Sequence, residues 1–99
     1  MPHHVLFSAQ AQADFDELYA FIADRAGEAT AEAYMARLDD YVRAFGQFPE
    51  RGTRYDHIRP GLRITGFERR VSIAFTVRDG AVIILRLLYA GRSLELPPE

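Results

Sequence analysis

The chain has 99 residues, of which 48% are hydrophobic and 26% charged, and it contains no cysteine. This length and apolar fraction exclude a disordered chain and predict one domain around one core. The lack of cysteine excludes disulfide frameworks and thiolate metal sites, and the lack of an apolar run of about 18 residues excludes a membrane span. The N-terminal residues lack the basic and apolar stretches of a signal peptide, so we expect a cytoplasmic protein.

Charge is distributed unevenly along the chain, although the formal net charge is only −2. Residues 1–50 contain three arginines and nine acidic residues, whereas residues 51–99 contain nine arginines and five acidic residues. All 12 basic residues are arginine. Arginine makes planar, bidentate contacts with carboxylates and phosphates, and no lysine is present as a proton donor or Schiff-base former. We expect an acidic or nucleic-acid partner for the basic half.

The first half of the chain predicts a short strand and two helices. Residues 4–8 are β-prone, Ser8 is a suitable N-cap for a first helix, and Gly27 is a natural stop. A second helix is predicted from about Glu28 and must end before Pro49. The apolar stripes of the two helices are Ala11, Phe15, Leu18 and Ile22, and Tyr34, Leu38, Tyr41, Phe45 and Phe48. Because the joint is short, the helices must pack antiparallel as a hairpin.

The second half predicts three strands after a polar connection over residues 50–61. Period-two alternation indicates strands from Leu62 and over residues 70–77, and an Asp79-Gly80 turn leads into an apolar strand over residues 81–90. The tail from about residue 94 is expected to be loose.

The element order is therefore strand-helix-helix-strand-strand-strand. We expect an α+β fold in one domain over residues 1–99, with an antiparallel sheet and the helical hairpin packed on one face. The first strand and the strand from Leu62 are expected to run in opposite directions.

Familiar catalytic and metal-binding patterns are missing from the sequence. The three histidines, His3, His4 and His57, lack metal-ligand spacing, the glycines form no nucleotide-binding loop, and no serine lies in a nucleophile elbow. We therefore expect neither a metal nor a cofactor.

Arg86 interrupts the apolar strand over residues 81–90, in phase with Val82 and Ile84, so its charge requires a partner. One interpretation is an internal ion pair that fastens the strand to a helix. The other is a cationic surface beside Tyr89 that binds an acidic partner or a phosphate backbone. This surface would consist of Arg63, Arg69, Arg70, Arg86 and Arg92. The catalytic set of a ribonuclease would be Arg63, Arg86, Tyr89 and Arg92, but no histidine or lysine of these strands supplies a general acid or base.

Three segments, in this order and spacing, carry a family resemblance. They are Phe48-Pro49-Glu50-Arg51-Gly52, Arg59-Pro60-Gly61-Leu62-Arg63 and Ile84-Leu85-Arg86-Leu87-Leu88-Tyr89. Together with the strand and helical hairpin before them, they resemble the RelE/ParE toxin superfamily, nearer to its ParE (plasmid stabilisation) branch, from about Val5 to Glu95. The resemblance implies an antiparallel sheet that carries a helical hairpin.

The resemblance also implies the toxin of a type II toxin-antitoxin system. ParE-like toxins are associated with inhibition of DNA gyrase and replication, RelE-like relatives cut messenger RNA in the ribosome, and an antitoxin with an extended C-terminal segment inactivates both. We expect a non-enzymatic gyrase inhibitor in a hetero-oligomer with a ParD-like antitoxin. An antitoxin tail that is apolar on one side and acidic on the other would suit the arginines named above. The alternatives are a RelE-like, metal-independent mRNA endoribonuclease and a non-toxic protein-interaction module.

The sequence departs from the family pattern at three points. ParE-like sequences often read Ile-Phe-Tyr-Arg-Val where this chain has Ile73-Ala74-Phe75-Thr76-Val77, and their last strand commonly ends in histidine where Tyr89 stands here. RelE-like nucleases use lysines, which this chain lacks. The last departure argues against the ribosomal nuclease.

Overall fold

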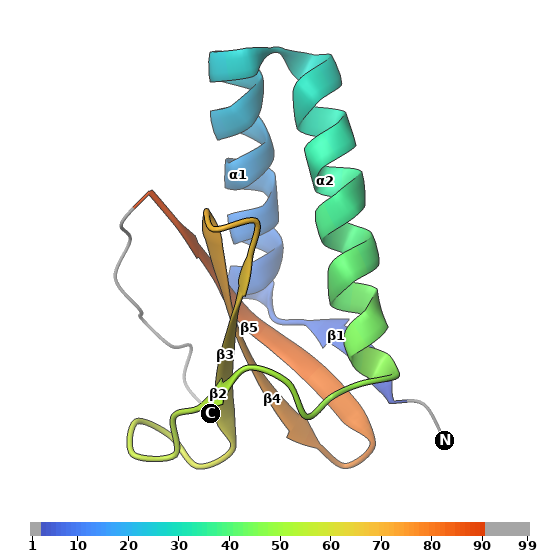
Figure 1. Cartoon of the computed structure of the whole chain (residues 1–99), viewed down its shortest axis with the longest axis vertical. Coiled ribbons are helices and arrows are strands. Elements are labelled where there is room, and N and C mark those ends of the chain that lie inside the picture. Colours follow the sequence, from blue (N-terminus) through green and yellow to red (C-terminus); the bar gives the residue numbers. More distant parts are fainter. Residues whose placement is uncertain (1–2, 91–99) are drawn as a thin grey trace.

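The structure, a computed structural model, describes residues 3–90 and consists of two long helices packed on one face of a five-stranded sheet (Figure 1). The elements are β1 (His4–Phe7), α1 (Ala9–Ala26), α2 (Glu28–Arg43), the 3-10 turn η1 (Ala44–Gly46), β2 (Thr53–Arg54), β3 (Leu62–Phe67), β4 (Val71–Arg78) and β5 (Ala81–Tyr89). The tip of the helical hairpin extends beyond the sheet, and the turn between β3 and β4 reaches up alongside the middle of the helices (Figure 1). The expected α+β fold with a helical hairpin is confirmed.

The helix boundaries follow the capping signals in the sequence. The Ser8 side chain accepts a hydrogen bond from the Ala11 N–H at 3.0 Å and so caps α1. Gly27 separates the two helices with a φ of 93°, a backbone conformation that glycine adopts without steric cost. Because this joint is a single residue, the helices turn back on each other as expected.

The sheet is mixed rather than wholly antiparallel, with strand order β1-β5-β4-β3-β2. β1 pairs in parallel with β5, whereas β2 with β3, β3 with β4 and β4 with β5 pair antiparallel. β1 and β3 therefore run in the same direction, and the expectation that they run in opposite directions is wrong. The reason is β2, which runs opposite to β3 within the connection predicted to be irregular, so the chain reverses once more before β3.

Gly52 allows this extra strand to lie close to β3. Its φ is 76°, and a Cβ added there would lie 2.4 Å from the carbonyl oxygen of Ile64. Any larger residue would therefore push β2 away from its partner.

The main core lies between the helices and the sheet. Leu18, Leu38 and Phe45 from the helical segment pack in one cluster with Ile73 and Phe75 of β4. Burying one such side chain stabilises the fold by about 1.5–3 kcal/mol. The predicted stripes are confirmed up to Phe45.

Phe48, which the helical spacing also assigned to the core, is 66% exposed. The second helix ends at Arg43 and gives way to the turn η1, so helical spacing no longer decides which side chains face inward.

A β-bulge changes which side of β5 faces the helices. Ile84 pairs with Phe75 and Arg86 pairs with Ala74, so Leu85 is the extra residue. Before the bulge even-numbered residues of β5 enter the main core, and after it odd-numbered residues do. The expectation that Arg86 lies in phase with Val82 and Ile84 is therefore wrong.

Candidate partner-binding groove

Arg86 forms a buried ion pair with Asp14 of α1. Arg86 is 9% exposed and Asp14 3%. The guanidinium donates from Nε to Asp14 Oδ2 at 2.7 Å and from Nη2 to Oδ1 at 3.1 Å, a bidentate arrangement. This geometry confirms the internal ion pair, the first of the two interpretations of Arg86.

The same carboxylate completes the hydrogen bonding of the edge of β5. β1 covers this edge only as far as Ile84, and α1 lies beside it from there on. Asp14 Oδ2 accepts the Leu87 N–H at 2.9 Å, and the Ser8 hydroxyl donates to the Leu85 carbonyl at 2.9 Å. The start of α1 thus satisfies backbone groups that an edge strand would expose to pairing with other chains.

The predicted cationic residues do not share one face of the sheet. Arg63 pairs with Phe75 and Arg86 with Ala74, which are consecutive residues of β4. Consecutive residues of a strand point to opposite faces, so the register assigns the two arginines to different faces. Arg92 lies outside the described residues. The sequence predicts Arg63 and Arg86 on one cationic surface, whereas the register assigns them to opposite faces of the sheet.

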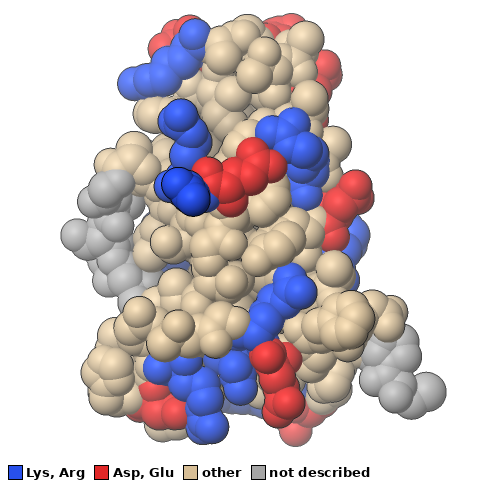
Figure 2. Space-filling model, in the orientation of Figure 1, with Lys and Arg blue, Asp and Glu red and all other residues tan. Residues whose placement is uncertain are grey.

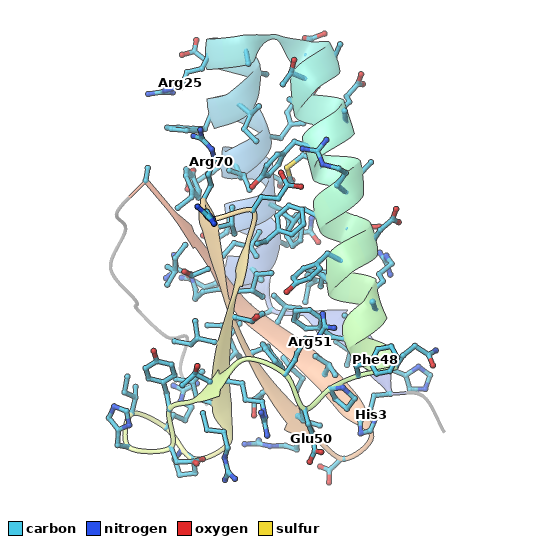
Figure 3. The ribbon with its side chains drawn as sticks, in the orientation of Figure 1. His3, Arg25, Phe48, Glu50, Arg51 and Arg70 are labelled. Carbon is cyan, nitrogen blue, oxygen red and sulfur yellow. The ribbon has the colours of Figure 1, made fainter. Side chains whose placement is uncertain are left out.

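Arg63 lies instead near the foot of α2. Its Nη1 donates to the Arg51 carbonyl at 3.3 Å. The Arg51 guanidinium stacks over Phe45 and Tyr41, 4.8 and 5.2 Å from the ring centroids, and in Figure 3 it lies close to the end of α2. These contacts hold the two arginines against the main core.

Arg69, Arg70 and Tyr89 come together elsewhere, in a groove of about 770 Å³ between the hairpin and the β3–β4 turn. Figure 3 shows Arg25 of α1 and Arg70 of the turn on the same side of the molecule, and Figure 2 shows basic side chains along that side. The apolar lining includes Leu18, Phe21, Ile22, Tyr34, Val71 and Tyr89, and the charged lining is Arg25, Arg37, Glu68, Arg69 and Arg70. We call this site the hairpin groove.

The charge of the hairpin groove is strongly positive, with four arginines and one glutamate among its lining residues. Glu68 pairs with Arg37 of α2: Nε donates to Oε2 at 2.9 Å and Nη2 to Oε1 at 3.1 Å. Arg25 stacks on Phe21 at 3.7 Å from the ring centroid. Within the described part of the chain, Arg69 and Arg70 are exposed and make no ion pair. The groove therefore offers two unused guanidinium groups to an anionic ligand.

The Arg37–Glu68 bridge leads to a prediction about titration. Its hydrogen bonds hold the pKa of Glu68 below the ordinary 4.5, so Arg37→Gln is expected to raise that pKa toward 4.5. Since the folded-state pKa is lowered, the contribution of the bridge to stability is present above the unfolded-state pKa and is lost as the pH falls through the folded-state pKa. An NMR titration of the side-chain carboxyl carbons measures this change.

Asp56 serves as the internal control for that titration. Its pKa is also lowered, chiefly by the hydrogen bond from the Gly61 N–H and further by Arg54, which are both remote from Arg37. We expect the pKa of Asp56 to stay in place in Arg37→Gln. An unchanged pKa of Glu68 in that variant would show that the bridge is absent in solution.

Tyr34 is a groove residue that sequence reasoning placed only in the core. It is 8% exposed, its ring packs edge-on against Phe67 at 5.5 Å, and its buried hydroxyl has no hydrogen-bond partner. Burial, reinforced by Glu68, raises the pKa of Tyr34. The signal available in the sequence was a tyrosine at a core position, because a buried phenol usually has a partner.

The turn that carries Glu68 has an unusual backbone. Glu68 and Arg69 have φ values of 48° and 60°, in the left-handed region that favours glycine and asparagine. Each such residue costs roughly 1–2 kcal/mol relative to an ordinary conformation. Two of the four non-glycine residues with positive φ in the described part of the chain thus form one wall of the hairpin groove.

The described part of the chain was compared with the requirements of a metal site and of a membrane-spanning helix. Over residues 3–90, no group of three or more histidine and acidic side chains could hold a metal ion. None of the helices in that range is long and apolar enough to cross a bilayer.

Comparison with known proteins gives one family and several related structures. The family described as "ParE toxin of type II toxin-antitoxin system, parDE" matches residues 5–94. A chain of the "Chromosomal ParDE TA system from P. aeruginosa" superposes with a TM-score of 0.76 at 24% identity, covering 88% of this chain and 95% of that one. The conserved hypothetical protein HP0894 from Helicobacter pylori superposes with a TM-score of 0.53 at 17% identity, covering 89% and 94%. At these identities, the two structures show a shared fold. No curated protein matches the chain.

Proposed function

This chain belongs to the ParE toxin family of type II toxin-antitoxin systems, and on that premise we propose that it inhibits DNA gyrase and is neutralised by an antitoxin bound in the hairpin groove. The observation that supports the antitoxin site is the groove itself, which combines an apolar floor with an arginine rim. Toxin and antitoxin would form a hetero-oligomer in the cytoplasm.

The chemistry of the groove selects one kind of partner segment. Its floor suits leucine and isoleucine side chains, and its rim offers Arg69 and Arg70 to carboxylates. A segment that is apolar on one side and acidic on the other satisfies both requirements. The acidic outer faces of the helices would repel such a segment elsewhere and steer it toward the basic rim, which affects the association rate more than the affinity.

A non-enzymatic inhibitor fits the site better than a ribonuclease does. General acid-base catalysis requires its groups within hydrogen-bonding reach of one substrate. Arg86 is engaged by Asp14, and the strand register assigns Arg63 to the opposite face. Two of the residues proposed for RNA cleavage, Arg63 and Arg86, are thus separated, which favours binding to a protein target.

A supercoiling assay with purified gyrase tests the proposal. We expect the purified chain to inhibit supercoiling, and the antitoxin encoded by the adjacent gene to restore it. In cells, expression should induce the DNA-damage response and filamentation before protein synthesis falls. Normal supercoiling together with an early arrest of protein synthesis would instead support the endoribonuclease. Neither effect would support the non-toxic interaction module.

A further inference from the structure

We propose that the Arg37–Glu68 bridge covers the Tyr34 hydroxyl in the hairpin groove of the free protein, and that an antitoxin segment displaces Glu68 by giving Arg37 a carboxylate of its own and Tyr34 a hydrogen-bond partner. This inference rests on the proposed function, because it takes the groove to be the antitoxin site. It assigns a binding role to Tyr34 and a gating role to Glu68.

The Arg37–Glu68 bridge spans the hairpin groove. Arg37 belongs to α2 and Glu68 to the β3–β4 turn, so their two hydrogen bonds, at 2.9 and 3.1 Å, join opposite walls of the groove. The side chains are 54% and 39% exposed, and ion pairs with such exposure stabilise a fold little. A carboxylate of the partner is chemically equivalent to that of Glu68. Arg37 therefore exchanges one for the other with little net change in free energy.

Tyr34 lines the hairpin groove close to the bridge. Tyr34 and Arg37 lie one helical turn apart on α2, and the guanidinium is 5.3 Å from the centre of the Tyr34 ring. The hydroxyl oxygen is buried and makes no hydrogen bond. A buried polar group without a partner destabilises the state that contains it. The free protein therefore carries an unfavourable feature that a bound segment would remove.

The β3–β4 turn brings a negative charge, that of Glu68, to the wall of the groove. Glu68 and Arg69 hold left-handed φ values, and Glu68 is tied to α2 by the bridge. Opening the bridge moves the acidic side chain of Glu68 away from the groove lining. Four arginines then face the incoming segment. The Glu68 carboxylate, which helps to cover Tyr34 in the free protein, thus also disfavours an acidic partner until it moves.

Calorimetric titration with the purified antitoxin encoded by the adjacent gene tests this inference. Tyr34→Phe is expected to weaken the complex about five-fold, the effect of one lost hydrogen bond. The same variant should unfold at an unchanged or higher urea concentration, because it removes an unsatisfied hydroxyl. Glu68→Gln is expected to tighten the complex by a similar factor, because the competing carboxylate is gone.

Tyr41→Phe is the matched control on the same helix. The Tyr41 hydroxyl donates to the Gly66 carbonyl at 3.1 Å and does not line the groove. Its removal should lower the urea midpoint and leave the affinity for the antitoxin unchanged. Tyr34 and Tyr41 are thus expected to show opposite patterns of stability and binding.

The outcomes separate this inference from the proposed function. If the unmodified chain forms no complex with the antitoxin, the proposed antitoxin site fails and the gate fails with it. If a complex forms but Tyr34→Phe binds as tightly as the unmodified chain, only the binding role of Tyr34 is overturned. Weaker binding by Glu68→Gln would show that Glu68 contacts the antitoxin and would overturn the gate.

Discussion

Replacing Asp14 by alanine is expected to destabilise the protein by about 3–5 kcal/mol, the usual effect of breaking a buried ion pair from one side. Arg86, only 9% exposed, would lose its carboxylate, and the Leu87 N–H would lose its acceptor. Urea unfolding followed by circular dichroism measures the change. The expected loss is a large fraction of the stability of an ordinary domain, so a partly unfolded population is expected at 37 °C.

Two companion variants isolate the ion pair from other effects. Asp16→Ala, on the exposed side of the same helix, should change the free energy of unfolding by less than about 0.5 kcal/mol. The double variant Asp14→Ala/Arg86→Ala should lose less stability than the sum of the two single variants, because the interaction is counted in each of them. Additive losses would mean that Asp14 and Arg86 act independently.

The buried pair also decides how Arg86 variants should be interpreted. A harmless Arg86→Ala protein would be expected whether Arg86 contacts the target or only holds β5 to α1. Because the guanidinium is committed to Asp14, loss of toxicity in that variant reports first on folding. Toxicity experiments are therefore better directed at exposed residues such as Arg69 and Arg70.

The sequence was informative wherever structure depends on neighbouring residues. The helical stripes, the Ser8 cap, the Gly27 joint and the β3–β4–β5 meander all follow from local periodicity and turn chemistry. β2 has two residues and no periodicity of its own, and it forms because the connection passes beside β3. The parallel pairing of β1 with β5 joins residues far apart in sequence, which no local pattern specifies.

The candidate site was predicted less well for the same physical reason. The sequence showed that Arg86 requires a partner, but Asp14 lies 72 residues away and is one of several acids with helical spacing. Simple strand alternation placed Arg86 on the same face as Val82 and Ile84, but the extra residue Leu85 puts it on the opposite face. The hairpin groove depends on how the tip of the hairpin meets a turn, which is a feature of tertiary packing alone.

The double charge reversal Arg69→Glu/Arg70→Glu is expected to weaken antitoxin binding about 100-fold at low salt. In water, each close contact between opposite charges contributes about 1 kcal/mol of attraction, and charge reversal turns it into repulsion of similar size. The change for two ideal contacts is thus about 4 kcal/mol. Imperfect contact reduces it to roughly 2.7 kcal/mol, which corresponds to 100-fold in affinity. Both side chains are exposed and make no ion pair among the described residues, so the fold should remain intact. Surface plasmon resonance at two salt concentrations measures the change.

Arg43→Glu/Arg54→Glu is the control for net charge, because it makes the same change of net charge at exposed positions outside the groove lining. It also breaks the surface ion pairs with Asp39 and Asp56, which contribute little to stability. We expect this control to weaken binding only slightly, through the overall field of the protein. In the groove variant the loss should appear in both rate constants and shrink as salt screens the charges. Equal losses in the two variants would mean that net charge alone drives association, and that the arginine rim does not define the site.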